Sequence, residues 1–194
     1  MINMNSVVAI ALAFMLLTLP CQGQKKYERE YRIKPGAVPP KAARFINDIF
    51  KKTTIHWYGE ESLTGTTIEA KLKAGGKRYS IEFDSSGTIQ DVEIQRSYSQ
   101  IPAQTRKALT DQLNQKFDTF TVVKTQLQWT ASQSDLKTAI LTDNLPASIQ
   151  VRYELILKAQ KNRSASYYEV LCEQTGAIVS IHQLVERNVN NLIY

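Results

Sequence analysis

The chain has 194 residues, with 24 Lys or Arg against 18 Asp or Glu, and its formal net charge is +6. Hydrophobic residues make up 43% and charged residues 22% of the chain, which has only 8 glycines and 6 prolines. This composition excludes collagen-like, disordered and coiled-coil proteins, and it predicts a globular chain of one domain or two small ones.

The N-terminal residues 1–23 contain no charged side chain and are predicted to be a signal peptide. The apolar run over residues 7–19 is shorter than the about 20 residues of a transmembrane helix, but it suits the core of an export signal. We therefore expect a periplasmic or extracellular protein with no transmembrane segment once the signal is removed. Lipidation of Cys21 is an alternative, although Pro20 stands where lipidation signals carry a small residue.

Residues 24–37 are predicted to be a basic arm and linker. Five basic and two acidic residues lie between Lys25 and Lys34, and the prolines from Pro35 to Pro40 oppose regular structure. The run is the most basic stretch of the chain, and a solvated arm explains it.

Residues 38–98 are predicted to form a first unit. Apolar residues recur every three or four positions after Pro40, as in an amphipathic helix, and alternate from Thr53 onward, as in strands. Gly75 and Gly76 predict a hairpin, and Ile89 lies out of phase with Val92, which indicates a β-bulge. The residues expected to be buried under the helix are Ile55, Trp57, Ile68, Leu72, Tyr79, Ile81 and Phe83.

Residues 99–187 are predicted to repeat this unit, with an insertion over 131–146 of one or two helical turns and a tail over 188–194. Trp129 takes the place of Trp57, and residues 154–159 resemble residues 69–74. The predicted fold class is α+β, with two tandem units, each a helix packed on a four-stranded antiparallel meander.

This arrangement resembles the PepSY-like family, also described as β-lactamase-inhibitor-like. The residues that carry the resemblance are Val38-Pro39, Phe45, Trp57, Glu69-Ala70, residues 79–84, Gly87 and Asp91-Val92. It is good over residues 38–95 and looser over 101–186, where Cys172-Glu173 replaces Phe83-Asp84. The resemblance implies an exported bacterial protein, often from Bacteroidetes, in a fold whose relatives bind and restrain secreted enzymes. It supplies no catalytic residue.

The residue inventory favours a protein that is not an enzyme. His56, His182 and Cys172 are too few for a nitrogen and sulfur metal site, and Cys172 lies in phase with core positions, so no catalytic residue, metal or cofactor is expected. Asp91 and Glu93 alternate with apolar residues and are assigned to a solvated sheet face. Acidic and basic residues are interspersed in both halves, which excludes a nucleic-acid partner.

We predict a non-catalytic binding module that contacts an envelope or secreted protein, with inhibition of that protein as one form the contact can take. Tyrosines beside charges on the uncovered sheet faces suit protein recognition. The expected partner-binding residues are His56, Tyr58, Glu69, Lys71, Arg152, Glu154 and Tyr167. The alternative is a carrier of a small ligand or glycan that uses a pocket between the two units. The oligomeric state is not predicted.

Overall fold

The computed structural model describes residues 24–63 and 65–185. The predicted signal peptide, Cys21 and the predicted tail lie outside the described residues. The strands are β1 Gln24–Arg32, β2 Ile55–Ser62, β3 Gly65–Ala74, β4 Lys77–Asp84, β5 Ile89–Arg96, β6 Thr119–Thr130, β7 Gln150–Lys161, β8 Ser164–Glu173 and β9 Ile178–Val185. The α-helices are α2 Pro40–Ile49, α3 Ala103–Asn114 and α4 Gln133–Thr142, and short 3-10 helices span Pro35–Ala37 and Tyr98–Gln100.

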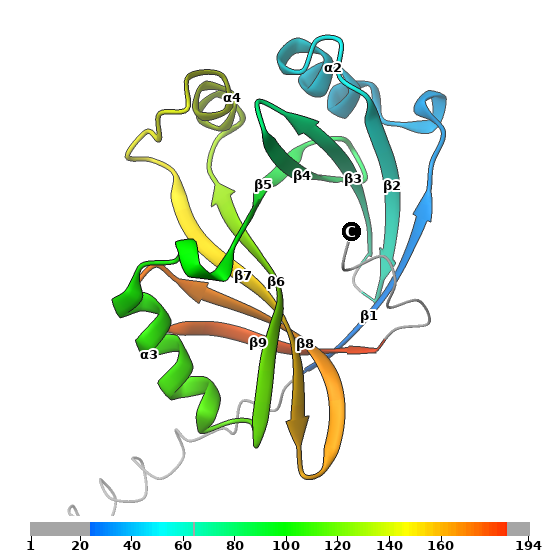
Figure 1. Ribbon diagram of the computed structural model, residues 1–194. Coiled ribbons are helices and arrows are strands. Elements are labelled where there is room, and N and C mark those ends of the chain that lie inside the picture. The colour runs from blue at the N-terminus through cyan, green and yellow to red at the C-terminus, as the bar shows by residue number, and fades with distance from the viewer. Residues whose placement is uncertain (1–23, 64, 186–194) are drawn as a thin grey trace, which may run out of the picture.

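The nine strands of the described residues form one closed sheet, so the prediction of two tandem four-stranded units is wrong. Each strand from β1 to β9 pairs antiparallel with the next, and β6 of the second half pairs with β5 of the first over Val92 to Arg96. The predicted basic arm is also wrong over residues 24–32, because it forms β1. This strand runs antiparallel to β2 and parallel to β9, and it closes the ring (Figure 1).

The individual helices and hairpins agree better with the prediction. The helix after Pro40, the hairpin at Gly75 and the bulge opposite Glu82 are all present. The 131–146 segment contains the ten-residue helix α4, which is longer than the one or two turns expected. Ser132 caps this helix by accepting a hydrogen bond from the Asp135 amide at 3.3 Å.

The helices pack on the outer face of the sheet over two hydrophobic cores. Helices α2 and α4 lie together at one end of the molecule, and α3 lies at the other (Figure 1). Trp57 and Trp129 belong to the same core, together with Leu136 of α4. The expected equivalence of the two tryptophans is therefore absent, and a helix from the second half completes the core of the first.

The second core is smaller and lies under α3. Leu109 and Leu113 of the helix pack there with Leu155, Val170 and Cys172, all of which are fully buried. The assignment of Cys172 to the core is confirmed. Burial and the nearby Glu173 carboxylate raise the pKa of its thiol to about 12, which keeps it neutral at ordinary pH.

The inner face of the sheet differs from the prediction of a free, solvated surface. Trp57, Ile81 and Phe83 are buried on the outer face as expected, but the alternate residues point into the ring. Glu93 is 5% exposed and Glu69 is 8% exposed. The assignment of Glu93 to a solvated face is thus wrong, since closure by β1 covers the face that two separate meanders would have left open.

None of the helices in the described residues is both long enough and apolar enough to span a membrane.

Candidate functional site

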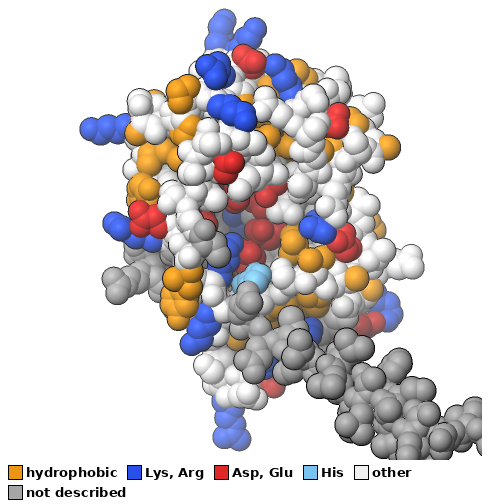
Figure 2. Space-filling view, turned by 180° about the vertical axis from the view of Figure 1, so that it is seen from behind, with side chains coloured by type: hydrophobic (Ala, Val, Ile, Leu, Met, Phe, Trp, Pro, Cys, Tyr) orange, Lys and Arg blue, Asp and Glu red, His pale blue; other side chains and the backbone are white. Residues whose placement is uncertain are grey.

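The centre of the inner face is strongly acidic. Eight carboxylates from seven strands lie there, and we call them the interior carboxylates: Glu30, Glu60, Glu69, Glu82, Asp91, Glu93, Glu154 and Glu169. Figure 2 shows acidic side chains gathered in a hollow of one face of the molecule, with basic side chains beside them. A buried group of like charges is costly unless cations or protons neutralise it.

Strand register places several of these carboxylates directly opposite one another. Glu69 pairs with Glu82, and Glu82 pairs with Asp91, so three acids form a row across β3, β4 and β5. Glu30 faces Glu60 across β1 and β2 in the same way. Side chains at such positions have Cβ atoms about 5 Å apart, and like charges there destabilise the sheet.

Burial, followed by nearby like charges, raises the pKa values of six of the interior carboxylates: Glu30, Glu60, Glu82, Asp91, Glu93 and Glu154. Burial and then the neighbouring carboxylates hold the pKa values of Glu82 and Glu93 well above the usual range. The same causes raise the pKa of Asp91 to about 7, with burial first and Glu69 second. Burial, followed by Glu169, raises the pKa of Glu154 to about 7. Several of these groups therefore hold protons near neutral pH.

Two lysines neutralise part of this charge. Lys71 Nζ lies 2.7 Å from a Glu30 oxygen and 3.0 Å from a Glu69 oxygen, which ties β1 to β3. Lys26 of β1 makes a 2.7 Å ion pair with Glu169 of β8. Burial alone would lower the pKa of both lysines, but the carboxylates outweigh it and raise the pKa. Strand β1, which closes the ring, is therefore held to β3 and β8 by ion pairs on the inner face of the sheet.

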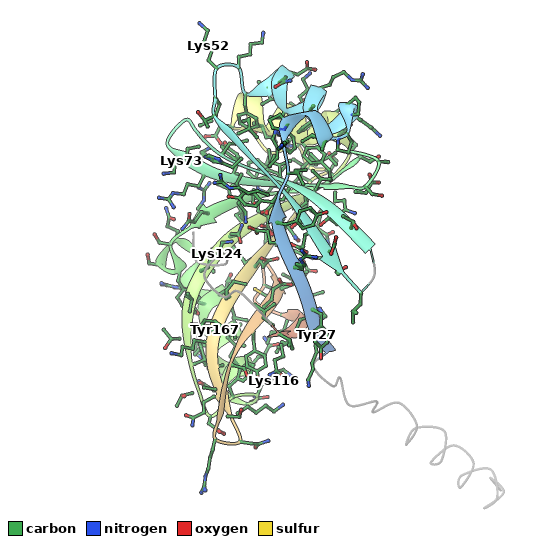
Figure 3. All side chains as sticks on the ribbon, turned by 90° about the vertical axis from the view of Figure 1, so that its right-hand side faces the viewer. Tyr27, Lys52, Lys73, Lys116, Lys124 and Tyr167 are labelled. Atoms are coloured by element: carbon green, nitrogen blue, oxygen red, sulfur yellow. The ribbon has the colours of Figure 1, made fainter. Side chains whose placement is uncertain are left out.

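A basic pocket lies at one end of the inner face, next to the carboxylates. It is a cavity of about 660 Å³ lined by the ends of β2, β3 and β4 and by parts of β5 and β6. The cationic side chains that line it are Lys52, Lys71, Lys73, Arg78 and Lys124, and His56 lies among them. Figure 3 shows Lys73 and Lys124 projecting from the same side of the molecule, with Lys52 above them. The volume is in the usual range of small-molecule sites.

Four of these cations make no ion pair within 4.0 Å with any described acidic residue, although Lys124 lies close enough to Glu93 and Glu154 to lower their pKa values. Among the described residues, the ion pairs within 4.0 Å do not include Lys52, Lys73, Arg78 or Lys124. They come from the segment before β2 and from β3, β4 and β6, so they surround the cavity rather than form one row. Unpaired cations around a concave site attract a ligand with several negative charges.

The residues predicted to bind a partner fall into three places. His56, Tyr58 and Lys71 line the basic pocket, and the Lys71 ammonium lies 4.8 Å from the centre of the Tyr58 ring. Glu69 and Glu154 are interior carboxylates. The role of all these residues in binding a partner stays a prediction.

Arg152 and Tyr167 lie outside the pocket lining. Arg152 donates from Nε to the Glu173 carboxylate at 2.9 Å, and Tyr167 lies on β8, well below Lys73 in Figure 3. The structure thus brings three of the seven predicted residues together in a cavity and leaves these two apart from it.

The prediction missed Lys73, Arg78 and Lys124. Lys73 and Arg78 face each other across the hairpin, two residues beyond Lys71 and two before Ser80 on the same face. Their alternation with Leu72 and Tyr79 was a usable signal. Lys124 follows a register shift between Val122 and Lys124 in β6, so alternation alone did not fix its side of the sheet.

Among residues 24–63 and 65–185, no group of three or more His, Cys, Asp or Glu side chains has an arrangement suited to a metal ion.

Comparisons with known proteins show similarity at the level of structure. No protein-family model matches the chain, and no curated protein matches it. The structure is similar to a predicted periplasmic protein from Bacteroides eggerthii, with a TM-score of 0.51 and 12% identity over 80% of this chain and 94% of that one. At this identity the likeness shows the fold alone.

Two further neighbours have lower scores. A DUF2874 family protein from Bacteroides ovatus matches with a TM-score of 0.49 and 11% identity over 75% of this chain and 88% of that one. A BLIP-like protein from Bacteroides fragilis matches with a TM-score of 0.48 and 12% identity over 80% of this chain and 94% of that one. The neighbours are thus Bacteroides proteins that include a BLIP-like one, and the PepSY-like part of the resemblance is not confirmed.

Proposed function

We propose that the protein is an exported, non-catalytic binding module that captures a ligand with two or more negative charges in the basic pocket. The observation that carries the proposal is the group of four cations around a cavity of about 660 Å³ that make no ion pair within 4.0 Å among the described residues. A single small anion can contact only some of these cations, because they lie on different strands. An extended polyanion, such as an acidic sugar chain, reaches more of them.

The basic pocket thus favours the alternative stated under Sequence analysis, a carrier of a small ligand or glycan. The pocket is lined mainly by β2 to β5, and Lys124 and Gln126 of β6 bring in the second half of the chain. The export signal and the fold shared with a predicted periplasmic protein support a place outside the cytoplasm.

A protein partner remains the second candidate, because His56, Tyr58 and Lys71 line the same cavity. A protein would use these cations by inserting an acidic segment. Hexaglutamate serves as the probe for this candidate, and trigalacturonate and naphthalene-1,5-disulfonate serve as probes for small polyanions.

Charge reversal tests the proposal by titration calorimetry on residues 24–194 at low salt. We expect trigalacturonate or the disulfonate to bind, and the pair Arg78→Glu with Lys124→Glu to weaken binding about tenfold or more, because two attractions become repulsions of about 1 kcal/mol each in water. The matched control, Lys116→Glu with Arg163→Glu, changes the same charges at exposed positions outside the pocket lining.

Each result of the titration bears on the proposal. Equal weakening in the control pair would mean general electrostatic attraction and would contradict the pocket. Absence of binding by both small polyanions would reject the ligand hypothesis. Binding of hexaglutamate alone would favour the protein partner.

A further inference from the structure

The basic pocket and the interior carboxylates are joined by direct hydrogen bonds. Ser80 lines the pocket, and its hydroxyl donates to the Glu69 carboxylate. Gln126 also lines the pocket, and its Nε2 donates to a Glu93 oxygen at 2.5 Å. Lys71 lines the pocket and pairs with Glu69 at 3.0 Å. Residues of the pocket wall thus contact the interior carboxylates directly.

The inner face therefore carries the basic pocket directly beside the interior carboxylates. Moving along each strand by two residues leads from the pocket to an acid: from Tyr58 to Glu60, from Lys71 to Glu69, from Ser80 to Glu82 and from Gln95 to Glu93. Residues two apart on a strand lie on the same face. A ligand anion in the pocket lies within the electrostatic reach of these acids.

The protonation of the acids must then affect the ligand. When the carboxylates are ionised, their negative charge opposes an anion in the pocket and competes for Lys71. When they hold protons, this opposition is removed. By reciprocity, a bound anion raises the proton affinity of the carboxylates by the same free energy.

We propose that anion binding in the basic pocket is coupled to proton uptake by the interior carboxylates, so that the protein holds its ligand more tightly as its surroundings become acidic. This inference rests on the proposed function. It stands on the row formed by Glu69, Glu82 and Asp91 and on the hydrogen bonds from Ser80 and Gln126. The raised pKa values of Glu82, Glu93 and Asp91 support it by placing their titration well above that of an ordinary carboxyl group.

Charged groups from all nine strands surround the row. Lys124 of β6 opposes the raised pKa of Glu93, and Lys26 followed by Lys124 opposes that of Glu154. The inward positions of the ring carry these further titratable groups: Lys26, Glu30 and Arg32 of β1, His56, Tyr58 and Glu60 of β2, Lys71 and Lys73 of β3, Arg78 and Asp84 of β4, Arg152 and Lys158 of β7, Tyr167, Glu169 and Glu173 of β8, and His182 of β9. His56 belongs to the pocket itself, and it is replaced in the test because histidine as a residue type can change charge between pH 5 and 8.

The test uses residues 24–194 with His56→Gln and the probe naphthalene-1,5-disulfonate, whose charge is constant. Titration calorimetry at pH 6.5 and 8.5, in buffers of different ionisation enthalpy, gives both the affinity and the number of protons taken up. We expect about tenfold tighter binding at pH 6.5, in the usual range of coupling between two sites, with net proton uptake. Adding Glu82→Gln and Glu93→Gln removes two of the interior carboxylates and is expected to tighten binding at pH 8.5 and to reduce the change to about threefold, because Asp91 and Glu154 remain.

A matched control keeps the fold-change interpretable. Glu61→Gln with Asp111→Asn removes two exposed carboxylates that lie in surface ion pairs, and it is expected to keep the tenfold change. Binding without proton uptake and without pH dependence would overturn the coupling and leave the proposed function intact. Absence of probe binding at every pH would overturn the proposed function, and the coupling with it.

Discussion

Replacing Gly176 by alanine is expected to lower the free energy of unfolding by about 2 to 4 kcal/mol. Gly176 has φ of 87° in the turn before β9, and a Cβ atom there would lie 2.5 Å from the Thr105 carbonyl oxygen and 3.1 Å from the Leu109 nitrogen. Both are backbone atoms of α3, so the whole helix must shift to relieve the clash. Left-handed strain adds to this cost.

The side-chain contacts of the same turn make that shift costly. Thr105 donates to the Gln174 carbonyl at 2.6 Å, and Gln112 donates to the Gly176 carbonyl at 2.8 Å. A helix that moves away loses these hydrogen bonds and opens the second core. Chemical denaturation of the variant measures the loss.

Gly75→Ala is the matched control for this prediction. Gly75 also has a positive φ, 55°, but a Cβ atom there meets nothing within 4 Å. We expect a loss of only about 1 kcal/mol, from backbone strain alone. Equal losses in the two variants would contradict the close seating of α3 on this turn.

Replacing Glu82 and Glu93 together by glutamine is expected to raise the free energy of unfolding by roughly 1 kcal/mol or more at pH 8, because Glu82 lies directly opposite two other acids. The pKa values of both carboxyl groups are well above normal in the folded protein because of burial and neighbouring acids. They are near the ordinary value of about 4.3 in the unfolded chain. Glutamine keeps the shape and removes the charge that the folded state must otherwise accept.

The sign of the pH dependence follows from proton counts. Between the unfolded and folded pKa values, the folded protein binds more protons than the unfolded chain, so stability falls as pH rises from about 5 to 8. The raised pKa values of Lys26 and Lys71 make the free energy of unfolding depend on pH only in the alkaline range. The lowered pKa values of Asp84 and Asp143 make the free energy of unfolding depend on pH only in acid, below about pH 4.

Thermal and denaturant unfolding at pH 5, 6.5 and 8 measures this dependence. The wild-type protein is expected to be most stable near pH 5, and the double variant is expected to have a flatter profile. Glu61→Gln, an exposed residue on the same strand as Glu60, is the control and is expected to keep the wild-type slope. A wild-type profile that rises from pH 5 to 8 would contradict the raised pKa values.

Local pattern predicted the helices and hairpins but not how they assemble. The alternation around Gly75 and the amphipathic pattern after Pro40 report on neighbouring residues, and both were right. Closure of the ring depends on pairing between β1 and β9, which are more than 150 residues apart, at Lys26 and Leu184 among others. A basic run such as residues 25–34 resembles a solvated arm until its partner strands are known.

The error about the inner face has the same origin. A charged residue that alternates with core residues is exposed in an open sheet and buried in a closed one. Glu93 therefore looked like a surface residue, and its true setting became visible only with the ring. His56, Tyr58 and Lys71 were predicted as binding residues from the same alternation and share one cavity, because the hairpin pattern placed them correctly.

An NMR titration of backbone amides in residues 24–194 with trigalacturonate tests most directly whether a polyanion occupies the basic pocket. We predict saturable shifts that are largest at residues 71–80 and 124–126, next to Lys73, Arg78 and Lys124. Largest shifts in β7 to β9, or no saturable shift at all, would contradict the account.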